Sequence, residues 1–355
     1  MTTLTLRPTT TFQAPATSFA DSPAERRGLR RDEVRLLVAG PGGIRHARFA
    51  DLPDHLRPGD LVIVNNSATV AGQLDGIWVR GSVEAPIVLH VGAVLDDLRR
   101  VVELRTPPDA ARSILDAEPG DVVRVARAAV TLLAPYPEPG SSPTGSGNRL
   151  WRARIDGDLA GTLRRHGRPI SYGYLAGHVP LSAYQSVFST EPGSVEMPSA
   201  GRPFTHEVIT RLVARGVGVA PVTLHTGFSS QEAGEAPQPE WFDVPAATAR
   251  LVTSTRAAGG RVVAVGTTVT RALESAVVDG RVLAGHGWTE RVVTPADPPQ
   301  VVDGLLTGWH DPGASHLLLV EAVAGPELTQ AAYDAATAEG YLWHEFGDAA
   351  LLLRR

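Results

Sequence analysis

The second half of the chain carries a hydrophobic pattern that alternates between helical and strand periods. Thr205 is placed to cap a helix whose apolar residues, within Val208–Val213, recur at helical spacing and stop before Gly216. Continuous apolar runs bounded by glycine or proline then predict buried strands. The expected order is strand Val217–His225, a loop from Thr226 to Asp243, a helix from Pro245 to about Ala258, strand Arg261–Val265 and helix Gly266–Ser275.

Strands and helices in this order predict two parallel strands joined by a right-handed crossover. Parallel strands end at the same edge of a sheet, so His225 and the segment Gly266–Thr268 are expected at one carboxyl edge. Open α/β sheets bind their ligands along that edge. The tail continues the pattern, with predicted helices Ser315–Ala324 and Glu327–Glu339 and a closing strand Ala349–Leu353.

The middle of the chain has a different, β-rich pattern. Between about Gly59 and Ile170, short apolar runs are separated by Gly, Pro and Asp turns, as in a sandwich or small barrel. The runs are Leu61–Val64, Ile87–Val91, Val101–Leu104, Val122–Val125, Val130–Leu133 and Trp151–Ile155, and Pro135–Asn148 has the composition of a flexible hairpin tip. The predicted fold class is α/β plus β: a mixed α/β sheet domain of residues 1–58 and 171–355, with an antiparallel β-barrel-like domain inserted at residues 59–170.

The composition removes several kinds of chemistry. The 355 residues include no cysteine, which excludes a disulfide framework, a thiolate nucleophile and a Cys-ligated zinc or iron–sulfur site. All 33 basic residues are arginine, so Schiff-base catalysis and a P-loop lysine are excluded as well. The eleven histidines show no metal-binding spacing, and we expect no metal and no prosthetic group.

The charge and hydropathy of the chain suggest where it works. A formal net charge of −5 argues against broad, nonspecific nucleic-acid binding but leaves room for a local arginine patch. No apolar run approaches the roughly 20 residues of a membrane span, and Met1–Ala20 lacks the features of a signal peptide. We therefore expect a cytoplasmic protein that does not enter a membrane. The oligomeric state stays open.

Several segments, in order along the chain, resemble the S-adenosylmethionine (SAM):tRNA ribosyltransferase-isomerases of queuosine biosynthesis. The most specific is VGTTVTRALES, which is similar to the family's VGTTSVRALES. The matching segments are Pro23–Val38, Leu56–Leu74, Tyr184–Ser189, Pro198–Thr205, Val222–Gly227, Pro239–Pro245, Val265–Ser275 and Phe346–Leu353. The resemblance covers nearly the whole chain and identifies it as a divergent member of that family.

The chain departs from the family pattern at several motif positions. Asn66 stands where the family has Asp, Ala68 and Gln73 stand where it has Arg, and Pro203 replaces a histidine. The residues after His225 differ from the family's glycine-rich continuation, and Gly308–Pro312 resembles the family segment only in part. Arginine binds phosphate in a bidentate manner. The loss of two arginines therefore bears on the binding of the second substrate, the ribosyl acceptor, more than on the binding of SAM.

The resemblance implies a reaction with two substrates. The ribosyl part of SAM moves onto the aminomethyl group of 7-aminomethyl-7-deazaguanine in tRNA, giving epoxyqueuosine and releasing adenine and methionine. SAM is then a co-substrate, and the tRNA anticodon stem-loop is the expected partner. Two alternatives stay open: a paralogue with the same SAM chemistry on a small-molecule or other acceptor, and a non-catalytic relative that binds SAM or RNA.

This chemistry needs a base for a proton beside the sulfonium, an acid for the departing adenine and a site for the methionine carboxylate. His225 is the first candidate for the base and His310 the second, and Glu240 is a candidate for binding ribose hydroxyls or for the acid. A purely structural role is the alternative for each. The predicted SAM-binding residues are Gly266, Thr267, Thr268 and Arg271 for an anionic group, and Tyr184 and Gln185 for the purine.

Overall fold

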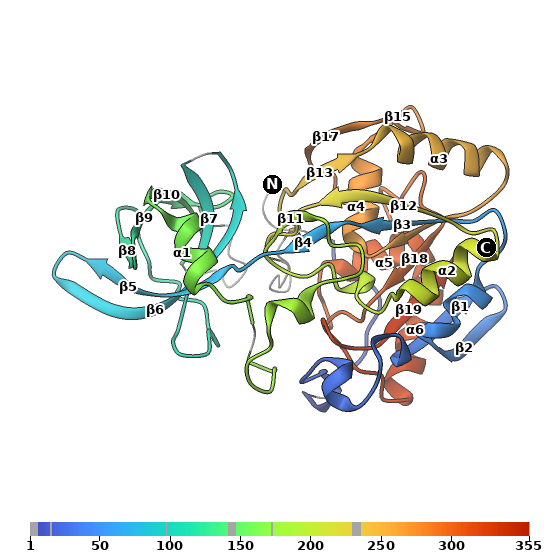
Figure 1. The fold of residues 1–355 in the computed structure, drawn as a ribbon, viewed down its shortest axis with the longest axis horizontal. Helices are drawn as coiled ribbons and strands as arrows, with labels where there is room; N and C mark the ends of the chain where they lie inside the picture. Colours follow the sequence, from blue (N-terminus) through green and yellow to red (C-terminus); the bar gives the residue numbers. More distant parts are fainter. Residues whose placement is uncertain are drawn as a thin grey trace.

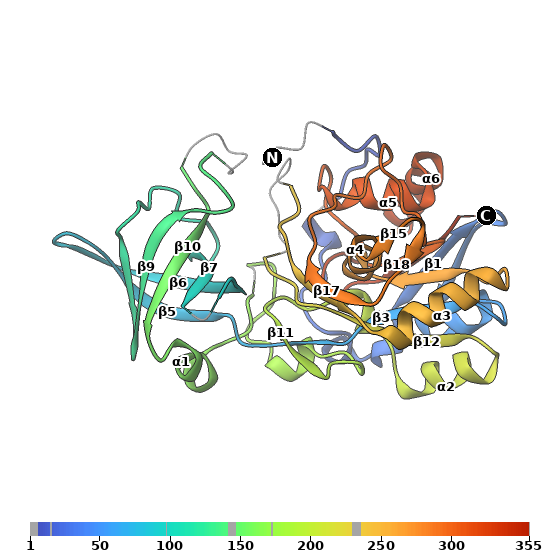
Figure 2. The same ribbon diagram turned by 90° about the horizontal axis from the view of Figure 1, so that it is seen from above.

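A large α/β part and a smaller barrel stand side by side in the computed structural model (Figure 1). The structure describes residues 6–14, 16–96, 98–140, 147–171, 173–228 and 236–354. Figure 2 shows the barrel at one end of the molecule, with the short strands β4 (Ser67–Thr69) and β11 (Glu191–Ser194) lying toward the α/β part. These two strands pair with each other in parallel.

The α/β part is built on a nine-stranded mixed sheet in the order β17-β13-β12-β3-β14-β18-β19-β1-β2. Its central strands β12, β3, β14 and β18 are mutually parallel, so their carboxyl ends lie at one edge. The strands are β1 (Arg35–Gly40), β2 (Gly43–Arg48), β3 (Leu61–Asn65), β12 (Gly218–Leu224), β13 (Trp241–Val244), β14 (Val262–Val265), β17 (Gly285–Trp288), β18 (Gly304–Thr307) and β19 (Ala349–Leu353).

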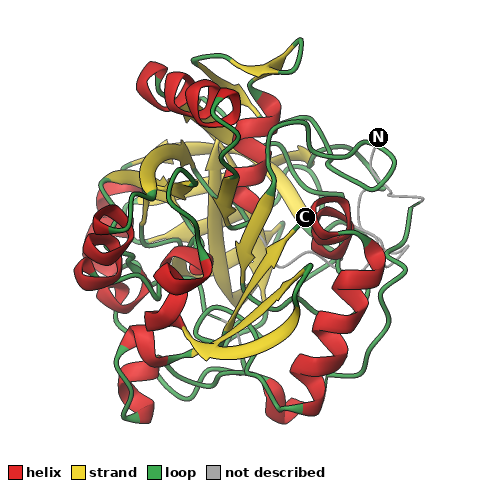
Figure 3. Cartoon of the chain, turned by 90° about the vertical axis from the view of Figure 1, so that its right-hand side faces the viewer, coloured by secondary structure: helices red, strands yellow, loops and turns green. Residues whose placement is uncertain are grey.

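Both faces of the central part of this sheet are buried, because successive side chains of its central strands enter different cores. In β3, Leu61 and Ile63 pack with the core that includes α3 to α6, whereas Val62 and Val64 pack with the core that includes α2. Figure 3 shows helices on both sides of the sheet. The α-helices of the α/β part are α2 (His206–Ala214), α3 (Ala246–Ala257), α4 (Thr267–Ser275), α5 (His316–Ala324) and α6 (Pro326–Ala338).

The smaller part is a closed antiparallel barrel, β10-β7-β6-β5-β8-β9, with its own hydrophobic core. In β10 the residues Trp151, Ala153 and Ile155 point into that core, while Arg152 and Arg154 between them are more exposed. The strands are β5 (Gln73–Arg80), β6 (Val83–Val94), β7 (Arg99–Arg105), β8 (Val122–Val125), β9 (Ala128–Pro135) and β10 (Leu150–Gly157), and α1 (Leu159–His166) follows.

The remaining elements are short. They are the two-residue strands β15 (Val277–Val278) and β16 (Arg281–Val282) and the 3-10 helices η1 (Ala16–Ser18), η2 (Ala24–Arg27), η3 (Arg31–Glu33), η4 (Phe49–His55), η5 (Leu181–Tyr184) and η6 (Ser199–Gly201). None of the helices that the structure describes has the length and apolar character required to cross a membrane.

The predicted fold class, a mixed α/β sheet with an antiparallel barrel, is confirmed. One boundary was wrong: Leu61–Val64, assigned to the inserted segment from residue 59, is β3 in the middle of the large sheet, and the barrel strands begin at Gln73. An apolar run buried on both faces is typical of a central parallel strand. The end of the predicted loop Thr226–Asp243 was also wrong, because Trp241–Val244 forms β13. Parts of that loop and of the hairpin tip Pro135–Asn148 lie outside the described residues.

Candidate functional site

A cavity of about 460 Å³ lies at the carboxyl edge of the central strands. Thr226 follows β12, Gly266 follows β14 and Thr307 ends β18, and all three line the cavity. Arg105 and Ala111 from the barrel part also line it, so the cavity reaches the place where the two parts of the protein meet. The position agrees with the expectation that the ligand site lies at this edge of the sheet.

Gly266, Thr267 and Thr268 form one wall of the cavity at the start of α4. Gly266 has φ +92°, a backbone conformation that residues with a side chain rarely adopt, and an added Cβ would lie 3.4 Å from Ala200 Cβ. A helix N-terminus presents backbone N–H groups and favours negative charge. The three predicted residues therefore lie together in the cavity wall, at a place suited to an anionic group.

Glu240 and Arg271 form a buried ion pair that also lines the cavity. Arg271 Nη2 donates to the Gln238 carbonyl oxygen at 2.6 Å and to Thr289 Oγ1 at 2.8 Å, and Gly227 N donates to Glu240 Oε1 at 2.9 Å. Burial raises the pKa of Glu240, and the charge of Arg271 opposes that change. Most of the Arg271 donors are thus used inside the protein, and only Nε lacks a partner among the described residues.

Two histidines of the cavity lining stack on each other. The rings of His310 and His316 are parallel within 3°, with centroids 4.8 Å apart, and His310 Nε2 lies 3.1 Å from Thr307 Oγ1. Enclosure by protein lowers the pKa of His310 well below its usual value and lowers the pKa of His316 to about 4. Both imidazoles are therefore neutral near pH 7.

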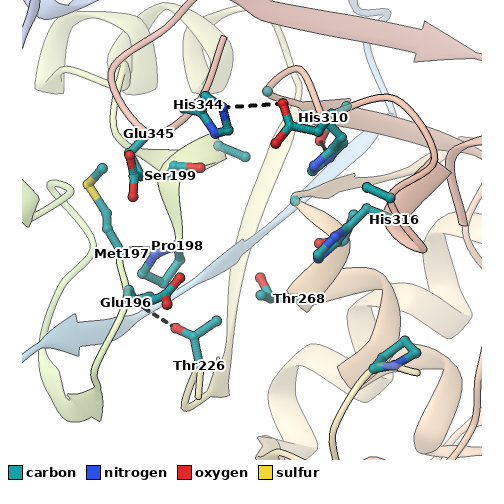
Figure 4. A pocket seen from close by; sticks show the side chains of 18 of the residues that line it. Glu196, Met197, Pro198, Ser199, Thr226, Thr268, His310, His316, His344 and Glu345 are labelled. Carbon is teal, nitrogen blue, oxygen red and sulfur yellow. Dashed lines mark hydrogen bonds and ion pairs between the residues drawn. The ribbon is translucent and has the colours of Figure 1, made fainter. Parts of the chain in front are cut away.

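The sequence did not point to His316 or to three other residues of the cavity wall, His344, Asp311 and Glu345. His344 Nε2 lies 3.3 Å from Asp311 Oδ1, the contact drawn as a dashed line from His344 in Figure 4. The His344 ring stacks on the Tyr174 ring with centroids 4.7 Å apart. His316 opens an apolar helix and His344 precedes the closing strand. Neither position has a local pattern that marks a site, so only the folded structure could identify them.

His225, the first candidate for the base, does not line this cavity. Its ring stacks on Trp241 with centroids 5.1 Å apart, and Nδ1 lies 2.8 Å from Ser67 Oγ. Partial burial lowers its pKa. The next residue, Thr226, does line the cavity, because side chains alternate in direction along an extended chain. A catalytic role for His225 stays a prediction, without support from its position.

Tyr184 and Gln185 also lie away from the cavity. Tyr184 is buried, with its ring 5.2 Å from that of Phe346 in an edge-to-face contact. The Gln185 side chain accepts a hydrogen bond from Thr69 N at 3.1 Å and donates one to Thr69 O at 2.8 Å. Their polar and aromatic groups thus serve packing in this structure, and the structure gives no support to the predicted contact with a purine.

No group of three or more His, Asp or Glu side chains that could hold a metal ion occurs within the part of the chain that the structure describes.

Comparison with known proteins places the chain in a family. The sequence profile described as "Queuosine biosynthesis protein" matches residues 9–352. The chain belongs to this family of queuosine biosynthesis proteins. It is 34% identical to the S-adenosylmethionine:tRNA ribosyltransferase-isomerase of a Bradyrhizobium species, with 97% of this chain and 96% of the relative covered. It is 35% identical to the Gloeobacter violaceus protein of the same name, with 96% and 94% covered.

A solved structure is similar as well. The crystal structure of the S-adenosylmethionine tRNA ribosyltransferase from Thermotoga maritima superimposes with a TM-score of 0.52 at 26% identity, over 96% of this chain and 99% of that one. Four residues at which this queuosine biosynthesis family member departs from the family pattern do not line the cavity: Asn66, Ala68, Gln73 and Pro203. Gln73, for example, is buried and lies 3.1 Å from His90 Nε2. The two segments that match the family only in part, after His225 and at Gly308–Pro312, do contribute to the lining through Thr226 and His310.

Proposed function

We propose that this protein transfers the ribosyl part of SAM to 7-aminomethyl-7-deazaguanine in tRNA and isomerises it to give epoxyqueuosine. Membership of the queuosine biosynthesis family supports this, as do relatives named S-adenosylmethionine:tRNA ribosyltransferase-isomerase over nearly the full chain. The observation that carries the proposal is the cavity at the carboxyl edge, which is lined by Gly266, Thr267 and Thr268 from the segment most similar to the family.

The cavity is suited to a cationic nucleoside. Its volume lies in the usual range for small-molecule sites, which is roughly 300–1,000 Å³. The carboxyl-bearing residues Glu196, Asp311 and Glu345 line it, and carboxylates attract a sulfonium group. The helix start at Gly266–Thr268 is suited to the methionine carboxylate of the same molecule. SAM carries both charges, so the lining fits its two ends.

The positions of the candidates suggest which residue acts as the base. Protons beside a sulfonium are acidified by the adjacent positive charge, so a neutral imidazole in contact with SAM can remove one. His310 lines the cavity and is neutral near pH 7, whereas His225 lies outside it. We therefore assign the base to His310. Glu240, anchored by Arg271 and Gly227 N, is assigned to the ribose hydroxyls.

The distribution of charge favours a tRNA that approaches from the barrel side. Residues 73–168 contain 13 arginines and 12 acidic residues, whereas the rest of the chain contains 20 arginines and 26 acidic residues. The barrel segment is thus the less acidic part, and it reaches the cavity through Arg105. The phosphate groups of RNA bind more favourably to a part of a protein that carries less negative charge. We assign the anticodon stem-loop to this side and the protein to the cytoplasm, where tRNA is modified.

The test is an incubation of the purified protein with SAM and tRNA that carries 7-aminomethyl-7-deazaguanine. We expect epoxyqueuosine after digestion to nucleosides, with adenine and methionine released in equal amounts. Adenine release without epoxyqueuosine would assign the protein to another acceptor. SAM binding without adenine release would contradict catalysis altogether.

A further inference from the structure

His344 lines the cavity and is paired with a carboxylate that also lines it. His344 Nε2 lies 3.3 Å from Asp311 Oδ1. An ionised carboxylate only accepts hydrogen bonds, so Asp311 holds the Nε2 proton and supplies a counter-charge when the ring carries a second proton. Nδ1 is then the nitrogen through which this imidazole can exchange a proton with a ligand.

Two aromatic rings and the backbone fix the position of the His344 imidazole. It stacks on the Tyr174 ring with centroids 4.7 Å apart, and the Phe19 ring meets it edge to face at 4.5 Å. The backbone of His344 has φ +67°, a left-handed conformation that costs free energy in a residue with a side chain. Residues in such conformations gather at active sites, where the rest of the structure holds them in place.

The His344 Nδ1 atom has no hydrogen-bond partner among the described residues. The side chain is 23% exposed, and since it lines the cavity, its remaining nitrogen is available to a bound ligand. The next residue, Glu345, is already engaged, because the Tyr174 hydroxyl donates a hydrogen bond to its carboxylate. His344 is thus a proton donor or acceptor of the cavity that no other part of the protein uses.

The two ends of the cavity suit different parts of SAM. Thr268, at the start of α4, lies at the end suited to the methionine carboxylate, and His344 lies at the other end (Figure 4). In SAM the adenine and the methionine carboxylate are at opposite ends of the molecule, with the ribose and the sulfonium between them. Adenine is therefore expected near His344, where Phe19 and Tyr174 also line the cavity and can contact a purine through their rings.

We propose that His344, with Asp311 as its counter-charge, is the general acid that protonates adenine as adenine leaves the ribose of SAM. This role rests on the proposed function, in which SAM loses adenine. The bond between ribose C1′ and adenine N9 breaks, and its electron pair stays on adenine. The proton on His344 Nδ1 moves to a ring nitrogen of adenine, N3 or N7, so adenine departs as a neutral base. The ribosyl part is not left short of electrons, because removal of the proton beside the sulfonium leaves a pair on that carbon.

The acid and the base then lie in different surroundings within one cavity. Burial lowers the pKa of His310, and the nearby rings of His316 and His344 lower it further. A positive charge on His344 thus helps to keep His310 neutral, as a base must be before it takes a proton. Acid and base pairs in enzymes are commonly separated by their surroundings in this way.

The test compares SAM with two analogues in which adenine N3 or N7 is replaced by carbon. His344→Phe keeps a ring that can stack on Tyr174 but has no proton to give. With SAM and tRNA, we expect this variant to release adenine about a hundredfold or more slowly than the wild type, with SAM affinity measured by calorimetry nearly unchanged. On the analogue that lacks the accepting nitrogen the wild type is already slow, so wild type and variant should release the base at equal rates.

Two further variants complete the test. Asp311→Asn should also slow adenine release from SAM, because the imidazolium loses its counter-charge. His46→Phe is the matched control and should behave as wild type. The His46 ring also contacts a tyrosine ring, that of Tyr341 at 5.7 Å, but His46 does not line the cavity.

The outcomes separate this role from the proposed function. Wild-type adenine release in His344→Phe would overturn the role of His344 and leave the proposed function in place. An equal loss on SAM and on both analogues would overturn it too, because proton transfer to N3 or N7 could not be the origin of that loss. A fall in SAM affinity that accounts for the whole effect would leave His344 with a binding role only and would also contradict the proposal. If the wild-type protein releases no adenine from SAM with tRNA, the proposed function fails, and the role of His344 fails with it.

Discussion

The ion pair between Glu240 and Arg271 offers a test of how the cavity wall is stabilised. Both residues are buried, at 7% and 8% exposure, and Glu240 also accepts a hydrogen bond from Gly227 N. Glu240→Ala would leave the guanidinium of Arg271 buried without its counter-charge. Removal of one partner of a buried pair costs about 3–5 kcal/mol, because the other charge stays out of water without compensation.

The size of this effect can be compared with a surface pair in the same protein. Arg124 and Glu84 approach to 2.7 Å, but their side chains are 54% and 53% exposed. Solvent screens such a pair, so Glu84→Ala should cost less than about 1 kcal/mol. The double variant Glu240→Leu with Arg271→Met should recover much of the stability lost in Glu240→Ala, because no charge is then left unpaired.

The measurement is urea unfolding followed by circular dichroism. A shift of the midpoint at unchanged slope reports a change in the free energy of unfolding. We expect Glu240→Ala to lower this free energy by several kcal/mol, Glu84→Ala to leave it nearly unchanged and the double variant to lie between them. A loss below about 1 kcal/mol in Glu240→Ala would refute the view that this buried pair supports the cavity wall.

Three further predictions concern the cavity. Lowering the pH from about 6.5 to about 4 should destabilise the protein partly through His316, whose pKa in the folded protein is about 4. In this pH range the unfolded chain binds a proton at His316 that the folded protein excludes, so the free energy of unfolding falls. His316→Asn should reduce this pH dependence in urea titrations. His310→Ala should lower kcat by about 10²–10⁴-fold while calorimetry shows retained SAM binding, and near-wild-type turnover would remove His310 from the mechanism. Gly266→Ala should weaken SAM binding, because alanine is strained at φ +92°; unchanged affinity would contradict a ligand role for this helix start.

Local sequence patterns determined most of the secondary structure. Thr205 accepts a hydrogen bond from Val208 N and caps α2 as its position predicts, and the closing strand runs from Ala349 to Leu353. Such features depend on neighbours a few residues away, so they can be read along the chain. The same reasoning placed Gly266–Thr268 at the carboxyl edge, because parallel strands end together.

The tertiary structure decided which strand lies at the centre of the sheet and which side chains share the cavity. Leu61–Asn65 pairs with β12 and β14, whose residues are about 150 to 200 positions further along the chain, and no local period records that pairing. His225 and Thr226 are adjacent in sequence, yet only Thr226 lines the cavity. His316 and His344 join His310 there, where the His316 ring stacks on His310 and His344 Nε2 lies 3.3 Å from Asp311 Oδ1. The sequence by itself therefore determined most helices and strands and the sheet edge at which the cavity lies, whereas long-range packing decided which side chains point into that cavity.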